Sequence, residues 1–352
     1  MQLRVLSQMN YRNLRPPRLE FGPGINAVVG ANAAGKSNLL EAAYLGCSGE
    51  LPGGKIAETL RIGTGEGFVG VRLEHHDGLR QIDIGLAPGR KVIRLDGQTV
   101  RALDLARAAA AVLITPEDAE LIHGSPSGRR QYLDSLLGRV SPRYAVLHKE
   151  YGRVLEQRNA ILKRAPNDPS LSVWSERFAE LGNEIASLRR RALVRIADIA
   201  ANSYRDISGG DKTLGAALLH DDIDLRDALQ DSYAEERARG VTVVGPHRDD
   251  LDLTLDGHSV QAYGSRGEAR TASLALRVAE YRLLRDKHDE APVLLIDDFS
   301  AELDAGRRDY LLALAEETPQ ALVSGTEAPP RAAQRFMIDE GDVRVETTAK
   351  RL

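Results

Sequence analysis

Residues 30–37 read Gly-Ala-Asn-Ala-Ala-Gly-Lys-Ser and match the phosphate-loop pattern G-x-x-x-x-G-K-[ST]. Glycine at positions 30 and 35 permits backbone angles that side chains would forbid, so successive N–H groups converge on phosphate oxygens. An apolar run over 25–29 precedes the loop and a helix-forming stretch follows Lys36, which is the strand–loop–helix context that this motif requires. The pattern predicts a nucleotide site in an α/β fold.

The residue types in this loop indicate a role for each part of it. Lys36 is predicted to reach the β and γ phosphates, and the Ser37 hydroxyl to coordinate Mg²⁺. The helix that begins near Lys36 adds the positive end of its dipole. A glycine-rich turn that matches by chance is the alternative, and the flanking strand and helix argue against it. The predicted nucleotide-binding residues are Gly30, Ala31, Asn32, Ala33, Ala34, Gly35, Lys36 and Ser37.

A second apolar run, Val293–Ile296, ends in two carboxylates, Asp297 and Asp298. A short run of aliphatic residues is typical of a buried strand in a parallel sheet, and ligands of such sheets lie at the carboxyl ends of the strands. We therefore expect Asp297 and Lys36 to converge, with Asp297 as a Mg²⁺ partner through water and Asp298 as the base that polarises an attacking water. The alternative is a buried strand that ends in an acidic cap.

Ser265-Arg266-Gly267-Glu268 precedes a helical stripe of apolar residues, at 272, 276, 279 and 283. A turn of small residues ahead of a helix is an anion site, although an ordinary N-cap by Ser265 explains the same pattern. Residues 207–211, Ile-Ser-Gly-Gly-Asp, form a competing candidate for the same role. We favour residues 265–268, because only they begin an apolar helix that leads to the strand carrying Asp297.

These segments, in this order, resemble the ABC-type ATPase heads of SMC-like DNA-repair proteins, and among them the RecF family of bacterial recombination mediators. The glycine-rich loop is shared by many families, whereas the segments around 245–250 and 265–267 are far more specific. The matching segments are Asn10-Tyr11-Arg12-Asn13-Leu14, Gly30–Ser37, Thr115-Pro116-Glu117-Asp118, Gly124-Ser125-Pro126, Arg129-Arg130, Leu133-Asp134, Gly245-Pro246-His247-Arg248-Asp249-Asp250-Leu251, Ser265-Arg266-Gly267, Ile296-Asp297-Asp298-Phe299 and Glu302-Leu303-Asp304.

The resemblance implies a weak, DNA-dependent ATPase that dimerises when ATP binds and that holds DNA at gaps or at single-strand/double-strand junctions. It also implies work with RecO and RecR to load RecA. In such a dimer, Ser265, Arg266, Gly267 and Glu268 form a signature loop that contacts the nucleotide of the second copy, and Asp304 lies in the loop that faces the partner. ATP and Mg²⁺ are the implied cofactors, and Lys36, Asp297 and Asp298 the implied catalytic residues.

The chain departs from the ABC pattern at three places. Asp298 stands where these ATPases usually carry glutamate, and the shorter carboxylate suggests slow turnover. The histidine that transporters use to sense γ-phosphate is missing, which leaves Ser324 or Thr326 as substitutes. The expected sensor glutamine is also missing, and Glu117 or Asp118 occupies its neighbourhood.

The cysteine content, the apolar runs and the net charge indicate a compartment and limit the partners that can be inferred. Cys47 is the single cysteine, which excludes intramolecular disulfides and suits a reducing compartment; we expect it to be a buried core residue. We see no secretory leader and no membrane span, so a cytoplasmic protein is expected. The net charge of −4 gives no global case for nucleic acid.

The basic charge is concentrated between residues 126 and 205, where the balance is +7 against −11 elsewhere. Solvated helices with arginine-rich faces explain such a region without DNA, but the family resemblance favours DNA. The predicted phosphate contacts are Arg129, Arg130, Arg189, Arg190 and Arg191. Arg248 is open between a phosphate contact and a salt bridge with Asp249 or Asp250.

The predicted fold is an α/β ABC-type ATPase head, mixed in its strands with a parallel core sheet, and carrying an inserted helical-hairpin lobe. The head comprises residues 1–122 and 240–352, and the lobe 123–239. One helix of the hairpin starts at Ser141-Pro142, a turn over 165–170 ends it, and a longer helix returns. Hydrophobic strands are expected on both sides of Gly245–Asp250, the first over Val241–Val244.

Two other functions are compatible with a phosphate loop. The ATPase subunit of a membrane transporter is disfavoured by the long separation between loop and signature, by the hairpin and by the absent histidine. A monomeric kinase or GTPase is the other, although the N-K-x-D segment of guanine-specific proteins is absent from the chain. Persistence as a monomer in ATP would favour this second reading.

Overall fold

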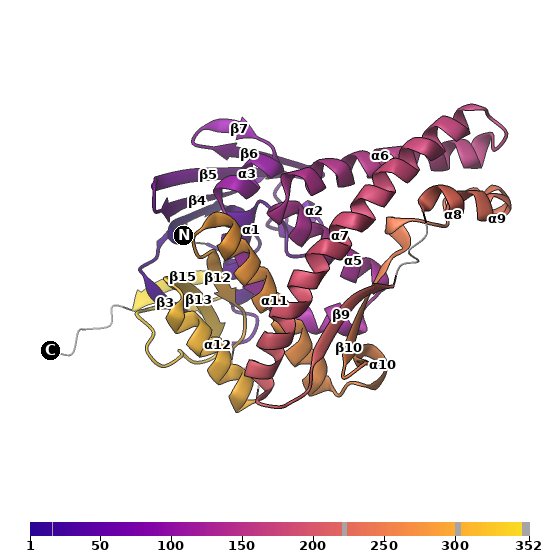
Figure 1. Ribbon diagram of the computed structural model, residues 1–352. Helices are drawn as coiled ribbons and strands as arrows, with labels where there is room; N and C mark the ends of the chain where they lie inside the picture. Colours follow the sequence, from indigo (N-terminus) through magenta and orange to yellow (C-terminus); the bar gives the residue numbers. More distant parts are fainter. Residues whose placement is uncertain (16, 220–223, 300–303, 347–352) are drawn as a thin grey trace. The chain divides into compact units, whose positions relative to one another are not determined.

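The computed structural model describes residues 1–15, 17–219, 224–299 and 304–346 (Figure 1). The chain forms two compact units. The first comprises Met1–Asp118, Arg205–Gly210 and Leu274–Leu352, and the second Ala119–Tyr204 and Asp211–Ser273. Residues 240–273 therefore group with the helical lobe in this division, whereas the expected boundary assigned them to the head.

The first unit contains a six-stranded sheet with the order β15-β14-β3-β13-β12-β8. Its neighbouring strands from β14 to β8 are parallel, and only β15 at the edge is antiparallel to its neighbour. Strands β3, β13, β12 and β8 are buried along nearly their whole length, as a sheet covered on both faces requires. The strands are β3 (Gly24–Val29), β8 (Ala111–Ile114), β12 (Val293–Ile296), β13 (Gln320–Gly325), β14 (Gln334–Asp339) and β15 (Asp342–Glu346). The predicted parallel core is confirmed.

A second, antiparallel sheet of the same unit has the order β2-β1-β4-β5-β6-β7. Its strands β4 to β7 lie side by side in the purple part of Figure 1. On β5, the buried residues Ile82, Ile84 and Leu86 alternate with more exposed ones, the pattern of a sheet with one covered face. The strands are β1 (Gln2–Met9), β2 (Arg18–Glu20), β4 (Gly67–His75), β5 (Gly78–Ala87), β6 (Arg90–Leu95) and β7 (Gln98–Val100).

Helices complete the first unit. Helix α1 begins at Lys36, directly after the phosphate loop, and Cys47 on it is buried as expected. The remaining helices are α2 (Ile56–Thr59), α3 (Ala102–Ala108), the 3-10 turn η1 (Pro116–Ala119) and α12 (Ala305–Glu317), with α1 itself spanning Lys36–Ser48. Helix α11 (Arg266–His288) begins in the second unit and ends in the first.

The second unit contains the predicted hairpin, formed by α6 (Pro142–Arg164) and α7 (Ser170–Ser208), whose last turn belongs to the first unit. Ser141 caps α6 by accepting a bond from the Tyr144 N–H, and Pro142 occupies the first turn, as the sequence predicted. The two helices run antiparallel and are joined by the Arg143–Glu184 and Arg177–Glu150 ion pairs (Figure 1). The shorter arm is about 35 Å long at 1.5 Å per residue.

Shorter elements surround this hairpin. A three-stranded antiparallel sheet has the order β11-β10-β9. The strands are β9 (Leu214–Leu219), β10 (Asp250–Leu255) and β11 (His258–Ser259). The helices are α4 (Glu120–His123), α5 (Pro126–Val140), α8 (Leu225–Asp231), α9 (Tyr233–Arg239), α10 (Val260–Tyr263) and the 3-10 turn η2 (Pro246–Arg248). None of the helices in the described part of the chain is long and apolar enough to cross a membrane.

The strand expected over Val241–Val244 does not form, so that prediction is wrong. Side chains take the backbone groups that a neighbouring strand would have bound. The Thr242 N–H donates to Asn159 Oδ1 at 2.8 Å, and the Val243 N–H donates to Glu236 Oε1 at 3.1 Å. A β-branched run favours extended backbone, but a strand also needs a partner with free backbone groups.

Candidate nucleotide-binding site

The phosphate loop connects β3 to α1 in the first unit. Gly35 has φ 113°, a conformation in which glycine is strongly favoured, and a side chain there would lie 2.9 Å from Asn13 Oδ1. Asn13 in turn accepts a bond from Asn38 Nδ2 at 2.7 Å, which ties the segment at 10–14 to the first turn of α1. Residues 10–14, one of the segments that carry the family resemblance, therefore pack against the phosphate loop.

Lys36 lies back over this loop. Its ammonium donates to the carbonyl oxygens of Gly30 and Ala31, each at 3.0 Å, and the side chain is only 6% exposed. No carboxylate among the residues that the structure describes pairs with it. A nearly buried ammonium whose partners are two neutral carbonyls retains one N–H and a full positive charge, the environment that suits a phosphate oxygen.

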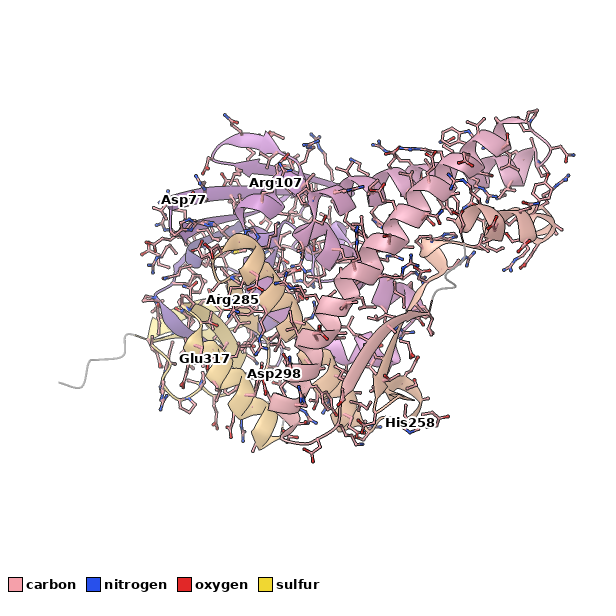
Figure 2. The ribbon with its side chains drawn as sticks, viewed as in Figure 1. Asp77, Arg107, His258, Arg285, Asp298 and Glu317 are labelled. Atoms are coloured by element: carbon pink, nitrogen blue, oxygen red, sulfur yellow. The ribbon has the colours of Figure 1, made fainter. Side chains whose placement is uncertain are left out.

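The strand order brings the two aspartates to the same sheet edge as this loop. Strand β13 lies between β3 and β12, and its Ser324 is fully buried. The Ser324 hydroxyl donates to Asp297 Oδ1 at 2.5 Å and accepts a bond from the Asp298 N–H at 2.8 Å. Asp298, labelled in Figure 2, has φ 50°, a left-handed conformation that few residues other than glycine adopt readily. One hydroxyl thus holds both aspartates.

Asp297 lies in a crowded acidic environment. Burial raises the pKa of Asp297 above its ordinary value, and the nearby Glu117 and Asp298 carboxylates raise it further. Hydrogen bonds from the hydroxyls of Ser324 and Ser37 act in the opposite direction. Burial likewise raises the pKa of Glu41, to which Asp297 and Glu117 also contribute. Excess negative charge beside a serine hydroxyl favours a divalent cation.

The donor set fits Mg²⁺ in particular. Across the described ranges, no three His, Cys, Asp or Glu side chains converge as a metal cage. Mg²⁺ rarely uses such a cage, because it keeps several waters and binds through one or two protein oxygens plus the phosphates of the nucleotide. Ser37 and Asp297, which are close enough for the Ser37 hydroxyl to lower the pKa of Asp297, would supply those protein oxygens.

The structure distinguishes between the residues that could replace the missing sensor glutamine and histidine. Asp118 is buried and receives two bonds from Arg277, at 2.9 and 2.6 Å, so it is committed to that ion pair. Glu117 is exposed and contributes to the electrostatic environment of Asp297. On the following strand, Ser324 is the buried partner of Asp297, whereas Thr326 is exposed. Glu117 and Ser324 are therefore the residues associated with the acidic site.

Replacement of Ser324 by alanine is expected to lower the ATPase rate about tenfold, because one bond of about 1.4 kcal/mol no longer holds Asp297. The concentration of Mg²⁺ needed for half-maximal rate should rise in parallel. Steady-state hydrolysis measured across Mg²⁺ concentrations checks both effects. Thr326→Ala is the matched control and should behave as wild type. Equal effects of the two variants would contradict the assignment of Ser324.

The predicted signature loop lies in the second unit, at the start of α11. Ser265 and Glu268 form a capping box, in which the Glu268 N–H donates to Ser265 Oγ at 3.2 Å and the Ser265 N–H donates to Glu268 Oε2 at 2.8 Å. The N-cap that the sequence offered as the alternative is therefore present. The capped Ser265 is exposed, so the cap is compatible with a phosphate contact.

The predicted partner-facing loop is described only in part. Asp304 is the N-cap of α12 and accepts a bond from the Arg307 N–H at 2.9 Å. Glu302 and Leu303, which belong to the same predicted segment, lie outside the described residues.

Two of the arginines predicted to contact DNA are buried, which argues against that role for them. Arg129 is 4% exposed and makes a bidentate ion pair with Asp250, at 2.7 and 2.8 Å. Arg189 is 1% exposed and donates to Asp134 at 2.6 Å and to Asp249 at 2.8 Å. A charge buried in this way is compensated by its acidic partners and presents little surface to a DNA phosphate.

A sequence signal for this burial exists. Arg189 lies four residues after Ile185 and four before Leu193, both of which are buried, so the helical period places it on the inner face of α7. Arg190 and Arg191 are exposed, as the same period requires. Arg130 is half-buried, with a bond of 2.6 Å to the Asp249 carbonyl. Arg248 is exposed and donates to the Thr242 carbonyl at 3.1 Å, so a phosphate contact stays a prediction for it.

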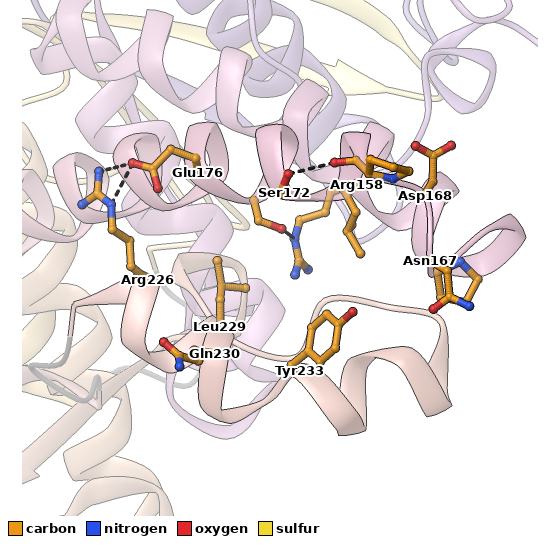
Figure 3. Close-up of a pocket in the computed structure, with 13 residues that line it drawn as sticks. Arg158, Asn167, Asp168, Ser172, Glu176, Arg226, Leu229, Gln230 and Tyr233 are labelled. Carbon is orange, nitrogen blue, oxygen red and sulfur yellow. Dashed lines mark hydrogen bonds and ion pairs between the residues drawn. The ribbon is translucent and has the colours of Figure 1, made fainter.

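A pocket of about 530 Å³ lies within the second unit, at the tip of the hairpin (Figure 3). Its lining includes no residue of the phosphate loop. Arg158 points its guanidinium into the pocket, between Leu229 and Tyr233 (Figure 3). That guanidinium is paired with Glu236 at 2.5 Å and is 1% exposed, so the floor of the pocket is a compensated ion pair. We assign no nucleotide to this pocket.

Comparison with known proteins shows which class of protein has this fold. The profile of the family described as RecF/RecN/SMC N terminal domain matches residues 2–330. The structure matches the Smc head domain from Pyrococcus furiosus with a TM-score of 0.56 at 16% identity, which shows the shared fold alone. Fold and site together define an ABC-type ATPase head of the SMC-like class.

More similar relatives narrow the class. Proteins named DNA replication and repair protein RecF, from Deinococcus deserti and Deinococcus radiodurans, are 48% and 47% identical; the matches cover 95% and 97% of this chain and 92% and 94% of theirs. The structure of the recombination mediator protein RecF with ATP matches with a TM-score of 0.91 at 29% identity, covering 98% of this chain and 97% of that one. The chain belongs to the RecF family. These relatives do not favour the transporter alternative.

Proposed function

We propose that this chain is an ATP-dependent DNA-binding protein of recombinational repair, which clamps DNA as an ATP-bound dimer and hydrolyses ATP slowly. The observation that carries the proposal is the interaction of Asp297, at the end of β12, with Ser37 of the phosphate loop, because a phosphate loop alone does not require a strand-end carboxylate. The resemblance of the whole chain to a structure of RecF with ATP supports the same conclusion.

The chemistry follows from the site residues. Lys36 and the loop N–H groups bind the β and γ phosphates, and Asp298 orients a water for attack on the γ-phosphate. Bound Mg²⁺, held by Ser37 and Asp297, would neutralise charge on the phosphates. Slow turnover is proposed because Asp298 is one methylene shorter than the usual glutamate and its backbone is held by Ser324.

The dimer is proposed because the signature loop needs a nucleotide that it can contact. Ser265, Arg266 and Gly267 of one protomer would meet the triphosphate held by Lys36, Ser37 and Asp297 of the other. Asp304 would face the partner in the same interface. ATP then stabilises the dimer over the separated chains, since the γ-phosphate adds contacts that exist only in the dimer.

The proposed nucleic-acid substrate is DNA with gaps or single-strand/double-strand junctions, and DNA is proposed to stimulate hydrolysis. RecO and RecR are the proposed partners in loading RecA, since the matched RecF–ATP structure is described as part of the RecFOR pathway. Arg190 and Arg191 are exposed on α7 and remain the proposed phosphate contacts. Arg130, which is half-buried, is also kept as a proposed contact.

Sedimentation with ATP, ADP or no nucleotide, each with and without gapped duplex, tests this function. We expect a dimer with ATP, a monomer with ADP, and co-sedimentation of the gapped duplex with the ATP-bound dimer. A chain that stays monomeric in ATP would favour the kinase-like alternative and remove the proposal.

The double variant Arg190→Ala/Arg191→Ala is expected to weaken DNA binding about equally for all sequences. Its plot of log affinity against log salt should be shallower by about two, since each phosphate contact releases about 0.9 counterion. Arg335→Ala, an exposed arginine on β14, is the control and should leave the slope unchanged. An unchanged slope in the double variant would exclude both residues as phosphate contacts.

A further inference from the structure

The capping box at the signature loop places a carboxylate where a phosphate is proposed to arrive. Glu268 Oε2 binds the Ser265 N–H at 2.8 Å, and Ser265 Oγ binds the Glu268 N–H at 3.2 Å. Ser265 is exposed, and its hydroxyl can rotate to donate a hydrogen bond to an incoming anion. The cap therefore orients Ser265 for an incoming anion, while the Glu268 charge opposes that anion.

The ammonium of Lys212 compensates this charge. Lys212 Nζ lies 2.6 Å from Glu268 Oε1, and both residues belong to the second unit. The hydrogen bond from Lys212, followed by those from Ser265, lowers the pKa of Glu268 to about 2, so the carboxylate is fully charged at neutral pH. The Lys212 side chain is 56% exposed, which leaves it accessible to a second negatively charged group.

The backbone next to Lys212 is fixed by the neighbouring turn. The Thr213 N–H donates to Asp256 Oδ1 at 3.0 Å, and the Asp256 N–H donates back to the Thr213 carbonyl at 3.0 Å. Lys212 directly follows residues 207–211, the glycine-containing segment that competed with residues 265–268 for the signature role. Although residues 207–211 were not favoured as the signature, the residue that follows them, Lys212, contacts Glu268 of the favoured segment 265–268.

We propose that Lys212 is a positioning residue of the trans nucleotide site: it neutralises Glu268, so that the capping box that orients Ser265 can face the triphosphate of a second copy. The inference rests on the proposed ATP-dependent dimer and adds a residue to its interface. Without the lysine, the uncompensated Glu268 carboxylate would repel the triphosphate at close range, where Coulomb interactions are strong.

Charge-neutral replacements separate this role from a structural one. Lys212→Met keeps much of the length of the side chain and removes its charge. Glu268→Gln keeps an acceptor for the Ser265 N–H, since glutamine serves in capping boxes as glutamate does. Both side chains of the pair have exposed surface, and such ion pairs contribute little to folding, so all variants should have melting temperatures close to that of the wild type.

The experiment measures the ATP-dependent dimerisation constant of the full-length wild type, Lys212→Met, Glu268→Gln and the double variant by sedimentation. We expect Lys212→Met to dimerise about tenfold more weakly at low salt, and the defect to shrink as salt screens the repulsion. The double variant should recover to within about twofold of wild type, and Glu268→Gln should dimerise at least as well as wild type. Binding of ATP to the monomer should be equal in all four.

The possible results test the role of Lys212 separately from the proposed ATP-dependent dimerisation. If the wild type dimerises with ATP and Lys212→Met dimerises equally well, Lys212 has no positioning role. A double variant as weak as Lys212→Met would also overturn the inference, because the lysine would then act through something other than Glu268. Glu268→Gln dimerising clearly more weakly than wild type would overturn it too. A wild type that never dimerises with ATP removes the proposed function and the inference together.

Discussion

Replacement of Lys36 by alanine is expected to weaken ATP binding about 10- to 150-fold, the equivalent of one charge-assisted hydrogen bond of about 1.5–3 kcal/mol. Lys36 is 6% exposed, and among the described residues its ammonium donates to the Gly30 and Ala31 carbonyls, so alanine removes the charge from the loop itself. Dimerisation in ATP should be lost with binding. Calorimetric titration of ATP, combined with sedimentation, measures both.

Two further variants isolate the charge of Lys36. Lys36→Met fills a similar volume without an ammonium and should lose affinity to about the same extent as alanine, which would exclude a packing defect. Lys55→Ala removes an exposed lysine from the same unit and should bind ATP normally. ATP affinity within about threefold of wild type in both Lys36 variants would refute the assignment of the phosphate loop as the nucleotide site, since threefold is less than 1 kcal/mol.

Ser265→Arg is expected to bind ATP as the wild type does and to remain monomeric. Ser265 is exposed, so the larger side chain does not disturb the core; the lost cap costs about 0.5–2 kcal/mol, which a helix as long as α11 should tolerate. The added guanidinium fills the space in front of the loop and removes the hydroxyl proposed to contact the partner's phosphate. Sedimentation velocity in ATP and in ADP gives the oligomeric state.

Matched variants place the signature at one of its two candidate positions. Ser265→Thr keeps a capping hydroxyl and should dimerise, whereas Ser208→Arg, on the competing segment, should have no effect. If Ser265→Arg dimerised in ATP and Ser208→Arg did not, the signature would have to be assigned to residues 207–211, and the proposed role of Lys212 would fail with it.

The hairpin and the parallel core sheet were predictable because each depends on a local pattern. Ser141-Pro142 is a helix start by its own chemistry, and a run such as Val293–Ile296 is apolar enough to specify a buried strand. Val241–Val244 is entirely β-branched, which also favours a strand, yet it forms none, because Asn159 and Glu236 bind its backbone groups. The composition of a segment does not reveal which distant side chains will compete for its backbone.

The arginines illustrate the same limit for function. Their clustering along the chain predicted a DNA-binding face, but Arg129 and Arg189 pair with acidic residues, Asp250 and Asp249, that are far away in the sequence. Helical periodicity was sufficient to place Arg189 inward. For Arg129, the bidentate partner is 121 residues distant, and no local pattern indicates it.

The sequence by itself determined the phosphate loop, the strand-end aspartates and the family, because each is a run of residue types whose chemistry is local. Tertiary structure alone decided that Ser324 holds both aspartates, that Asp118 is committed to Arg277 and that Lys212 reaches Glu268. These contacts join residues 26 to 159 positions apart, and a polar side chain meets such a partner only after strand order and helix packing have set both backbones.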